Sequence, residues 1–315
     1  MPFNVTYVSS IASFTRRGMA LIVIQSFIFL ILNIAAFVGN LLVCLAIYRN
    51  PSLRTVTNNF ILSLALTDLL MAVVVMPVYT VSSLLDRWIG GEVFSQIICC
   101  CLLLAGYTSI LHVALLAINR YFRVVRPQMY RNIYSKKSSA MMAVVTWVVT
   151  VVLVSSYPLL GVRYEVSESN PTISKLSFGN AVSHIYIYAI FLASLYRIVP
   201  VFVIVICYVK IFKTIHQHNT AAAPSTQEGN SPYGVEEAKI TRLLTAVVVG
   251  FCLCWFPTLI FRILDIFKLV PSTVFKYIVF ISVFPIFTSS VVNPIIYGFL
   301  NQSFRSEFLK IIRLK

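Results

Sequence analysis

One apolar run constrains the fold of this chain more than any other feature: it extends from Val93 to Val125 and has Asn119 and Arg120 near its end. A helix of that length, at about 1.5 Å per residue, exceeds the ~30 Å hydrocarbon core of a bilayer. The run therefore predicts a tilted transmembrane helix. Because an arginine at the edge of the hydrocarbon core is costly unless it is paired or reaches water, Arg120 is a candidate functional residue.

Six further apolar runs, separated by polar loops, bring the number of expected spans to seven. They lie near residues 18–48, 58–85, 138–162, 181–212, 240–266 and 273–300. With 59% hydrophobic and only 11% charged residues in 315, the chain is too apolar for a soluble domain. We expect an all-α fold, with residues 1–17 as an N-terminal segment and 18–300 as a seven-transmembrane helix bundle.

Residues 301–315 predict a short amphipathic helix at the inner membrane surface, followed by the C-terminus. The apolar residues Phe304, Phe308, Ile311 and Ile312 recur there at helical spacing, opposite charged residues.

The net charge of +15 comes mostly from basic residues on one side of the predicted membrane spans, which argues against nucleic acid as a partner. Most basic residues fall in the loops on one side of the predicted spans, and the positive-inside rule makes that side cytoplasmic. An odd number of spans then places the N-terminus outside a plasma membrane and the C-terminus inside. Asn4 begins an Asn-Val-Thr sequon on the outer side, a candidate glycosylation site.

The two longest loops differ in composition. Residues 216–234 are rich in Ala, Ser, Pro and Gln, which predicts a flexible cytoplasmic loop. The outer loop from Arg163 to Asn180 is rich in serine and has no cysteine. All seven cysteines lie inside apolar runs, so we expect no outer disulfide and a mobile outer loop.

Five of the runs carry an ordered set of polar and bulky residues. The set comprises Asn40, Asp68, Asn119-Arg120-Tyr121, Trp255 with Pro257, and Asn293-Pro294-Ile295-Ile296-Tyr297. In this order, with Trp147 and Pro200 between its members, it resembles the rhodopsin-like family of G-protein-coupled receptors over essentially the whole chain. The resemblance implies a seven-helix receptor that binds an extracellular ligand and activates a heterotrimeric G protein. It implies no catalytic chemistry.

Family positions imply a mostly apolar ligand pocket, which suits a small or lipid-like molecule. Its implied lining is Leu102, Leu103, Gly106, Leu192, Tyr196, Trp255, Thr258, Leu259, Arg262, Val283 and Phe287. Arg262 has two interpretations that remain open: it contacts the ligand, or it forms an ion pair with Asp265, three residues further along the helix.

Departures from the family pattern narrow the ligand class. Leu102 occupies the position where amine receptors carry an aspartate, so we expect a ligand that is not an amine. Phe287 occupies the position of the retinal-binding lysine of opsins, so we expect no retinal. Ser95 replaces the cysteine of the outer disulfide, as in melanocortin-type receptors, whereas Asn119 resembles melatonin receptors. Other segments resemble adenosine receptors, and these signals do not agree on one subfamily.

Asp68 lies near the middle of the second run and has two interpretations. It is either a buried, protonated partner of Asn40 and Asn293 or, as the resemblance implies, part of an allosteric sodium site. The implied sodium ligands are Asp68, Ser109, Ser289, Ser290 and Asn293.

The resemblance also implies an activation switch centred on Arg120. Its members are Asn119, Arg120, Tyr121, Tyr208, Glu237, Trp255, Pro257, Asn293, Pro294 and Tyr297. The acid that precedes the arginine in the family is Asn119 here. Glu237 lies twenty residues before Pro257, about 30 Å along a helix, and is the remaining acid that can hold Arg120 at the inner end. We therefore expect measurable activity without ligand.

Two other classes compete with a receptor. A transporter or channel could use Asp68 and Arg197 along an ion path, but the sequence lacks the internal repeat that many transporters show. An intramembrane enzyme has still less support, because neither a His-Glu-x-x-His nor a Gly-x-Ser-x-Gly motif occurs.

Overall fold

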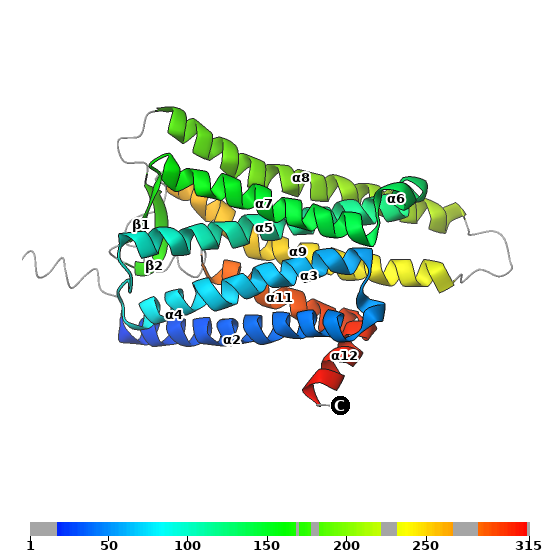
Figure 1. Cartoon of the computed structure of the whole chain (residues 1–315), viewed down its shortest axis with the longest axis horizontal. Helices are drawn as coiled ribbons and strands as arrows, with labels where there is room; N and C mark the ends of the chain where they lie inside the picture. Colours follow the sequence, from blue (N-terminus) through cyan, green and yellow to red (C-terminus); the bar gives the residue numbers. More distant parts are fainter. Residues whose placement is uncertain (1–17, 168–169, 178–182, 222–231, 267–282, 314–315) are drawn as a thin grey trace, which may run out of the picture.

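The computed structural model describes residues 18–167, 170–177, 183–221, 232–266 and 283–313. Within them the chain is a bundle of long helices that run along one axis (Figure 1). The long helices are α2 (Met19–Arg49), α3 (Val56–Leu70), α4 (Met76–Leu84), α5 (Glu92–Val125), α7 (Lys136–Leu159), α8 (Ser183–Ala221), α9 (Pro232–Ile266) and α11 (Phe284–Leu300).

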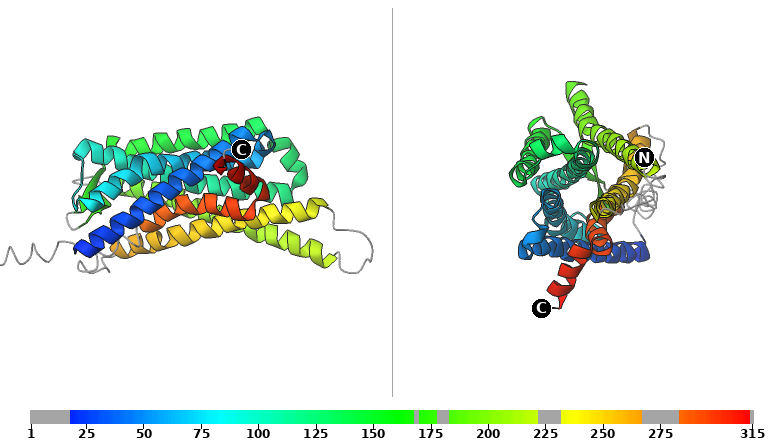
Figure 2. Two further views of the ribbon diagram at one scale, coloured as in Figure 1. Left: turned by 90° about the horizontal axis from the view of Figure 1, so that it is seen from below. Right: turned by 90° about the vertical axis from the view of Figure 1, so that its right-hand side faces the viewer.

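The predicted all-α, seven-helix architecture is confirmed. A π-helical turn, Met71–Val75, joins α3 to α4 into one span, so that the eight helices form seven. Five spans are long and apolar enough to cross a membrane, and shorter apolar stretches at Thr241–Pro257 and Phe284–Leu300 supply the other two. Seen along its long axis, the molecule is a bundle from which the C-terminal helix points outward (Figure 2).

Local sequence signals explain where several helices begin. The Thr55 hydroxyl caps α3 by accepting a hydrogen bond from the Asn58 backbone N–H. Ser135 and Ser138 form a reciprocal capping box at the start of α7. Pro127 occupies the first turn of the short inner helix α6 (Pro127–Ile133), where its missing N–H has no cost.

The longest helix, α5, organises the packing around it. It packs against α3, α7, α8 and α9, so residues on several of its faces are buried. Across the bundle, α2 and α11 approach closely at Gly39. A Cβ atom added there would lie 2.8 Å from the Pro294 Cβ, so only glycine allows this approach without a shift of the backbone.

The structure corrects the boundaries of the predicted cytoplasmic loop. Helix α8 continues to Ala221 and α9 begins at Pro232, so both ends of the predicted 216–234 loop are helical. The intervening residues 222–231 lie outside the described chain. The low-apolar composition that indicated a loop does not prevent helix formation, because both segments extend helices that are already formed and need no buried face of their own.

The outer segment after α7 is also more ordered than predicted. It forms an antiparallel hairpin of β1 (Arg163–Ser167) and β2 (Asn170–Ser177), with Arg163 opposite Ser177 and an irregularity at Val166/Ser167. Arg163 forms an ion pair with Glu92 in the first turn of α5. All seven cysteines are free, and Ser95 instead donates its hydroxyl to the Gly91 carbonyl. Whether the loop moves in solution stays a prediction.

The short helix α12 (Gln302–Ile312) follows α11 after a turn at Asn301, which caps it. Its buried Phe304 ring stacks on Tyr297 of α11, with 5.7 Å between centroids. The predicted amphipathic C-terminal helix is therefore present, and an aromatic contact holds it to the bundle.

Candidate functional site: the polar core and the inner switch

A buried carboxylate occupies the middle of the bundle. Asp68 lies on α3 and is 3% exposed. The Ser290 hydroxyl donates to its Oδ1 (2.8 Å), and the Asn293 amide donates to its Oδ2 (2.9 Å). The carboxylate thus joins α3 to α11 at the segment that contains Pro294. A buried carboxylate needs such partners, because leaving it without hydrogen bonds would cost roughly several kcal/mol of folding free energy.

Two residues expected around Asp68 bond elsewhere. Asn40 donates to the backbone carbonyls of Ala36 and Ser290, at 2.8 and 2.9 Å, and not to Asp68. The Ser289 hydroxyl donates to the Ile286 carbonyl in its own helix, at 2.7 Å. Serine in a helix often satisfies its hydroxyl in this way, and sequence does not show which bond it takes.

The predicted sodium ligands therefore come together only in part. Ser109 is buried on α5, as the prediction requires, and Ser290 and Asn293 contact the carboxylate directly. This set is rich in the oxygen atoms that a hard cation binds, and its only charge is a single carboxylate. By donor chemistry the residues fit a monovalent cation.

Arg120 is buried near the inner end of α5, only 1% exposed. Its Nη2 donates to the Thr57 hydroxyl (3.1 Å), and that hydroxyl donates to the Asn119 Oδ1 (3.1 Å). Thr57 lies in the first turn of α3 and is also buried. A relay of two neutral groups, the Thr57 hydroxyl and the Asn119 amide, thus contacts the Arg120 guanidinium where the family has an acid beside the arginine.

Sequence reasoning missed Thr57. The available signal was the polar stretch Thr55 to Asn59 at the start of an apolar run, which also supplies a helix cap. Asn59 from the same stretch donates to the Lys136 carbonyl and to the Ser139 hydroxyl. The stretch therefore connects α3 to both α5 and α7.

The tyrosines of the predicted switch have different environments. Tyr208 on α8 and Tyr297 on α11 are buried in one apolar cluster, which also contains Leu116 and Ala117 of α5. Tyr121, next to Arg120 in sequence, instead lies beneath the Lys210 ammonium, 5.6 Å from its ring centre. Tyr208 and Tyr297 are thus near the Arg120 level of the bundle, whereas Tyr121 faces α8.

The remaining switch acid falls in a described helix. Glu237 lies near the start of α9, at its inner end, as expected from the spacing to Pro257. Its side chain, and those of Thr258, Leu259 and Arg262, lie outside the described residues, as does Asn4.

The predicted ligand-pocket residues divide among three apolar clusters. Trp255 lies against Gly106, where an added Cβ would be 2.8 Å from the indole ring, and stacks on Phe251. Tyr196 stacks on Tyr107 with 4.7 Å between centroids. Leu103 and Leu192 belong to that second cluster.

The third cluster lies toward α2 and α4. Phe287 is fully buried there, edge-on to Phe29 and Tyr79, at centroid distances of 5.2 and 5.8 Å. Val283 and Leu102 pack in the same cluster. The described pocket residues are therefore distributed over three clusters, and Phe287 is fully packed between helices.

Comparison with known proteins gives a consistent result. A family model described as "7 transmembrane receptor (rhodopsin family)" matches residues 39–297. The melatonin receptor type 1A of Mus musculus is 29% identical over 290 residues, covering 91% of this chain and 79% of that receptor. The 5-hydroxytryptamine receptor 4 of Homo sapiens is 30% identical over 301 residues (88% and 76%). The histamine H2 receptor of Cavia porcellus is 30% identical over 314 residues (98% and 83%).

Proposed function

Because this chain belongs to the rhodopsin family of seven-transmembrane receptors, we propose that it responds to a small, mostly apolar ligand without a protonated amine. Family membership makes it a multi-pass membrane receptor that couples to a heterotrimeric G protein. It also excludes the enzyme, transporter and channel alternatives. The resemblance inferred from the motifs is confirmed.

The observation that supports an uncharged ligand is the environment of Leu102. Its side chain is half-buried against the cluster of Phe29, Tyr79 and Phe287, which offers no charge to a cation. A protonated amine brought into such a site needs a carboxylate to offset its desolvation. Among the acids of the described helices, Asp68 and Asp265 lie in the outer or middle part of the spans, and Glu92 lies at the outer end of α5, where it pairs with Arg163. Hydrogen bonds from Ser290 and Asn293 already engage Asp68.

The ligands in the names of the relatives differ in charge. Histamine and 5-hydroxytryptamine carry amines that are protonated at neutral pH, whereas the amine of melatonin is acetylated and therefore neutral. A ligand of the melatonin kind fits Leu102 better than the other two. Tyr196, Thr258 and Arg262 are the polar residues that we propose orient such a ligand, and a lipid-like molecule would meet the same apolar wall.

The test is a response assay in cells that express the chain, with cyclic-AMP and calcium readouts. Melatonin, 5-hydroxytryptamine and histamine are the first probes, followed by a library of neutral small molecules and lipids. We expect no response to the two protonated amines. A Leu102→Asp variant should gain affinity for an amine, whereas Leu102→Ala should not. A parent receptor that responds to either amine, with Leu102→Ala unchanged, would contradict the proposal.

We also propose that sodium binds at Asp68 in the resting receptor, with Ser109, Ser290 and the Asn293 carbonyl as further oxygen ligands. The partial convergence of these residues supports the proposal. The Ser289 hydroxyl donates its hydrogen to the Ile286 carbonyl, which leaves its oxygen lone pairs available, so Ser289 would join as a further ligand if its side chain reaches the ion. Bound sodium would supply a positive charge that offsets the buried carboxylate and favours the resting arrangement of α3 and α11.

For orientation, we propose an extracellular N-terminus, with a sequon at Asn4 available for glycosylation, and a cytoplasmic C-terminus. The basic residues between the spans support this arrangement.

For signalling, we propose that Glu237 restrains Arg120 and that the receptor is active to a measurable degree without ligand. The reason is that Asn119 is neutral, whereas an acid at that position would form an ion pair with the arginine.

A further inference from the structure

Helix α9 meets α11 at a residue that has no side chain. A Cβ atom added to Gly250 of α9 would lie 2.7 Å from Cγ1 of Val292 and 3.4 Å from Cδ1 of Ile296 on α11. Val247 and Cys254, one turn to either side on α9, carry side chains and are buried. The ridge of Val292 and Ile296, four residues apart, therefore fits into a notch in α9 that only glycine provides.

The short contact at this notch could not be relieved by rotating Val292. In a helix a valine strongly prefers one χ1 rotamer, because the preceding turn crowds its branched side chain. The Ile296 Cδ1 ends a longer side chain and lies at an ordinary distance, so it can give way. A side chain at residue 250 would therefore push the two helices apart.

The opposite side of α11 is held at the same level of the bundle. Asn293, next to Val292, donates to the Asp68 carboxylate of α3 at 2.9 Å. Pro294 lies directly against Gly39 of α2. Because α11 lies between α2 and α9 (Figure 2), it cannot retreat from α9 without disturbing these contacts.

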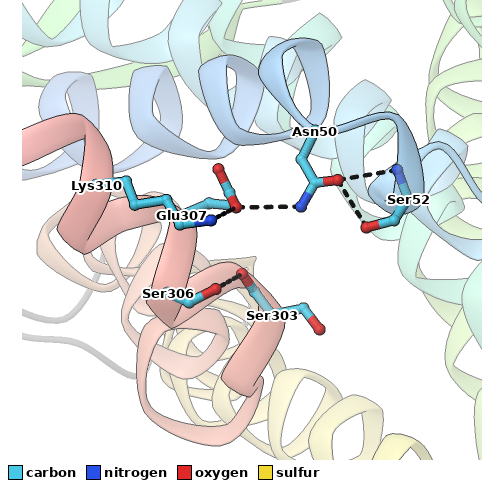
Figure 3. Close-up of polar contacts among 6 residues, drawn as sticks. All are labelled: Asn50, Ser52, Ser303, Ser306, Glu307 and Lys310. Carbon is cyan, nitrogen blue, oxygen red and sulfur yellow. Dashed lines mark hydrogen bonds and ion pairs between the residues drawn. The ribbon is translucent and has the colours of Figure 1, made fainter. Parts of the chain in front are cut away.

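The inner end of α11 is also held, through its continuation into α12. The Oε1 of Glu307 accepts hydrogen bonds from the Asn50 amide at the end of α2 (3.1 Å) and from the Lys310 ammonium (2.7 Å), as Figure 3 shows. Asn50 is itself held, because its Oδ1 accepts from the N–H and the hydroxyl of Ser52. A wedge between α9 and α11 would therefore displace α9.

The inner half of α9, residues 232–250, covers the level of the switch arginine. Arg120 is only 1% exposed, so no partner reaches its guanidinium until a neighbouring helix moves. Leu244 and Val247 of α9 are buried in the same apolar cluster as Ala117, which lies one turn before Arg120 on α5. Displacement of the inner half of α9 would therefore open the bundle next to Arg120.

We propose that Gly250 is a positioning residue of the activation switch. Its missing side chain lets α9 lie against Val292, and this contact favours the resting receptor. The inference rests on the proposed ligand-free activity, because it concerns the equilibrium that sets that activity. One methyl group forced into such a contact shifts the equilibrium toward the active receptor by about fivefold or more.

The first experiment measures ligand-free nucleotide exchange on each class of purified heterotrimeric G protein, with the full chain in nanodiscs. Gly250→Ala should exchange at least about fivefold faster than the parent. Val292→Ala removes the γ-carbon that the new methyl group would meet, so Gly250→Ala/Val292→Ala should return to the rate of Val292→Ala alone. Gly298→Ala is the matched control, because its Cβ would lie at an ordinary 3.5 Å from Phe308, and it should exchange like the parent.

The second experiment needs no G protein. Spin labels on non-natural amino acids replace Arg242 of α9 and Arg305 of α12, both of which are exposed, and pulsed electron resonance measures the distance between them. Gly250→Ala should lengthen this distance, and Gly250→Ala/Val292→Ala should restore it. If Gly250→Ala does not fold, the double variant should still recover the melting temperature of Val292→Ala alone.

An unchanged distance in a folded Gly250→Ala receptor would overturn the inference, as would a double variant that restores neither the distance nor the melting temperature. A longer distance with the exchange rate of the parent would also overturn it, provided that the parent exchanges faster than the G protein alone. If the distance lengthens but every receptor, the parent included, exchanges at the rate of the G protein alone, the role of Gly250 in placing α9 stands. In that case the proposed ligand-free activity is wrong.

Discussion

Replacing Thr57 by valine should raise the ligand-free activity of the receptor. Valine keeps the volume of threonine but removes the hydroxyl that accepts from Arg120 and donates to Asn119, both at 3.1 Å. A buried hydrogen bond to a charged group contributes about 1.5–3 kcal/mol and a neutral one about 1 kcal/mol. Because other contacts of Arg120 offset part of the loss, we expect the resting state to lose about 2 kcal/mol relative to the active state.

A change of that size shifts the equilibrium between resting and active receptors roughly 30-fold. If about one receptor in a hundred is active without ligand, the variant would have about one in four active. The assay is the rate of nucleotide exchange on a purified heterotrimeric G protein by receptor in nanodiscs, without ligand. Circular dichroism and melting temperature report whether the helices remain folded.

Two variants control for side effects of the substitution. Thr57→Ser keeps the hydroxyl and should behave as the parent. Thr67→Val makes the same change in the same helix, at a buried residue whose hydroxyl bonds only to the Ser63 carbonyl of the preceding turn. If Thr57→Val and Thr67→Val give the same exchange rate as the parent, the hydroxyl relay does not restrain Arg120 and the reasoning is wrong.

Three further predictions concern other parts of the molecule. Sodium should raise the melting temperature of the parent relative to choline at equal ionic strength, and Asp68→Asn should abolish that difference. If the parent melts at the same temperature in sodium and in choline, the sodium site is refuted. Because the pKa of Glu307 is lowered in the folded state, mainly by Lys310, its contribution is complete above the ordinary glutamate pKa of about 4.3 and is lost as the pH falls further. The protection of the amide hydrogens of residues 302–312, measured relative to their intrinsic exchange rates, should therefore fall in acid in the parent. In Glu307→Gln that protection should be low at every pH. Mild reduction should leave ligand binding and stability unchanged, and a loss of stability on reduction would reveal an unforeseen disulfide. The ion pair between Arg163 and Glu92 predicts that Arg163→Glu loosens the hairpin, which faster hydrogen exchange in the two strands would detect.

The spans and the order of the motifs could be predicted from the sequence because both depend on residues that are close together along the chain. Apolar length fixes a membrane span, and polar residues inside an apolar run stand out. The β-hairpin after α7 was missed because the serine-rich composition of the whole segment was interpreted as a loop, although Tyr164 and Val166 alternate with polar residues in β1. The ends of α8 and α9 were missed because inner helices extend beyond the apolar segment into water.

Side-chain partners in the polar core depend on helix rotation, which sequence does not fix. Ser290 and Asn293 face Asp68, whereas Ser289, one residue away, faces its own backbone. Asn40 was expected at Asp68 but reaches the Ser290 carbonyl, because α2 approaches α11 closely at Gly39. Short-range spacing therefore predicted which residues are buried in the core, but not which atoms they bond.

The switch is tested most directly by comparing ligand-free nucleotide exchange for the parent, Asn119→Asp, Glu237→Ala and Arg120→Ala in nanodiscs of one composition. An aspartate beside Arg120 adds the charge that the neutral relay lacks, so Asn119→Asp should be slower than the parent. Glu237→Ala should be faster, and Arg120→Ala should fall to the rate of the G protein alone. If the parent, Asn119→Asp and Glu237→Ala all exchange at the rate of Arg120→Ala, the receptor has no basal activity and the account of Arg120 is contradicted.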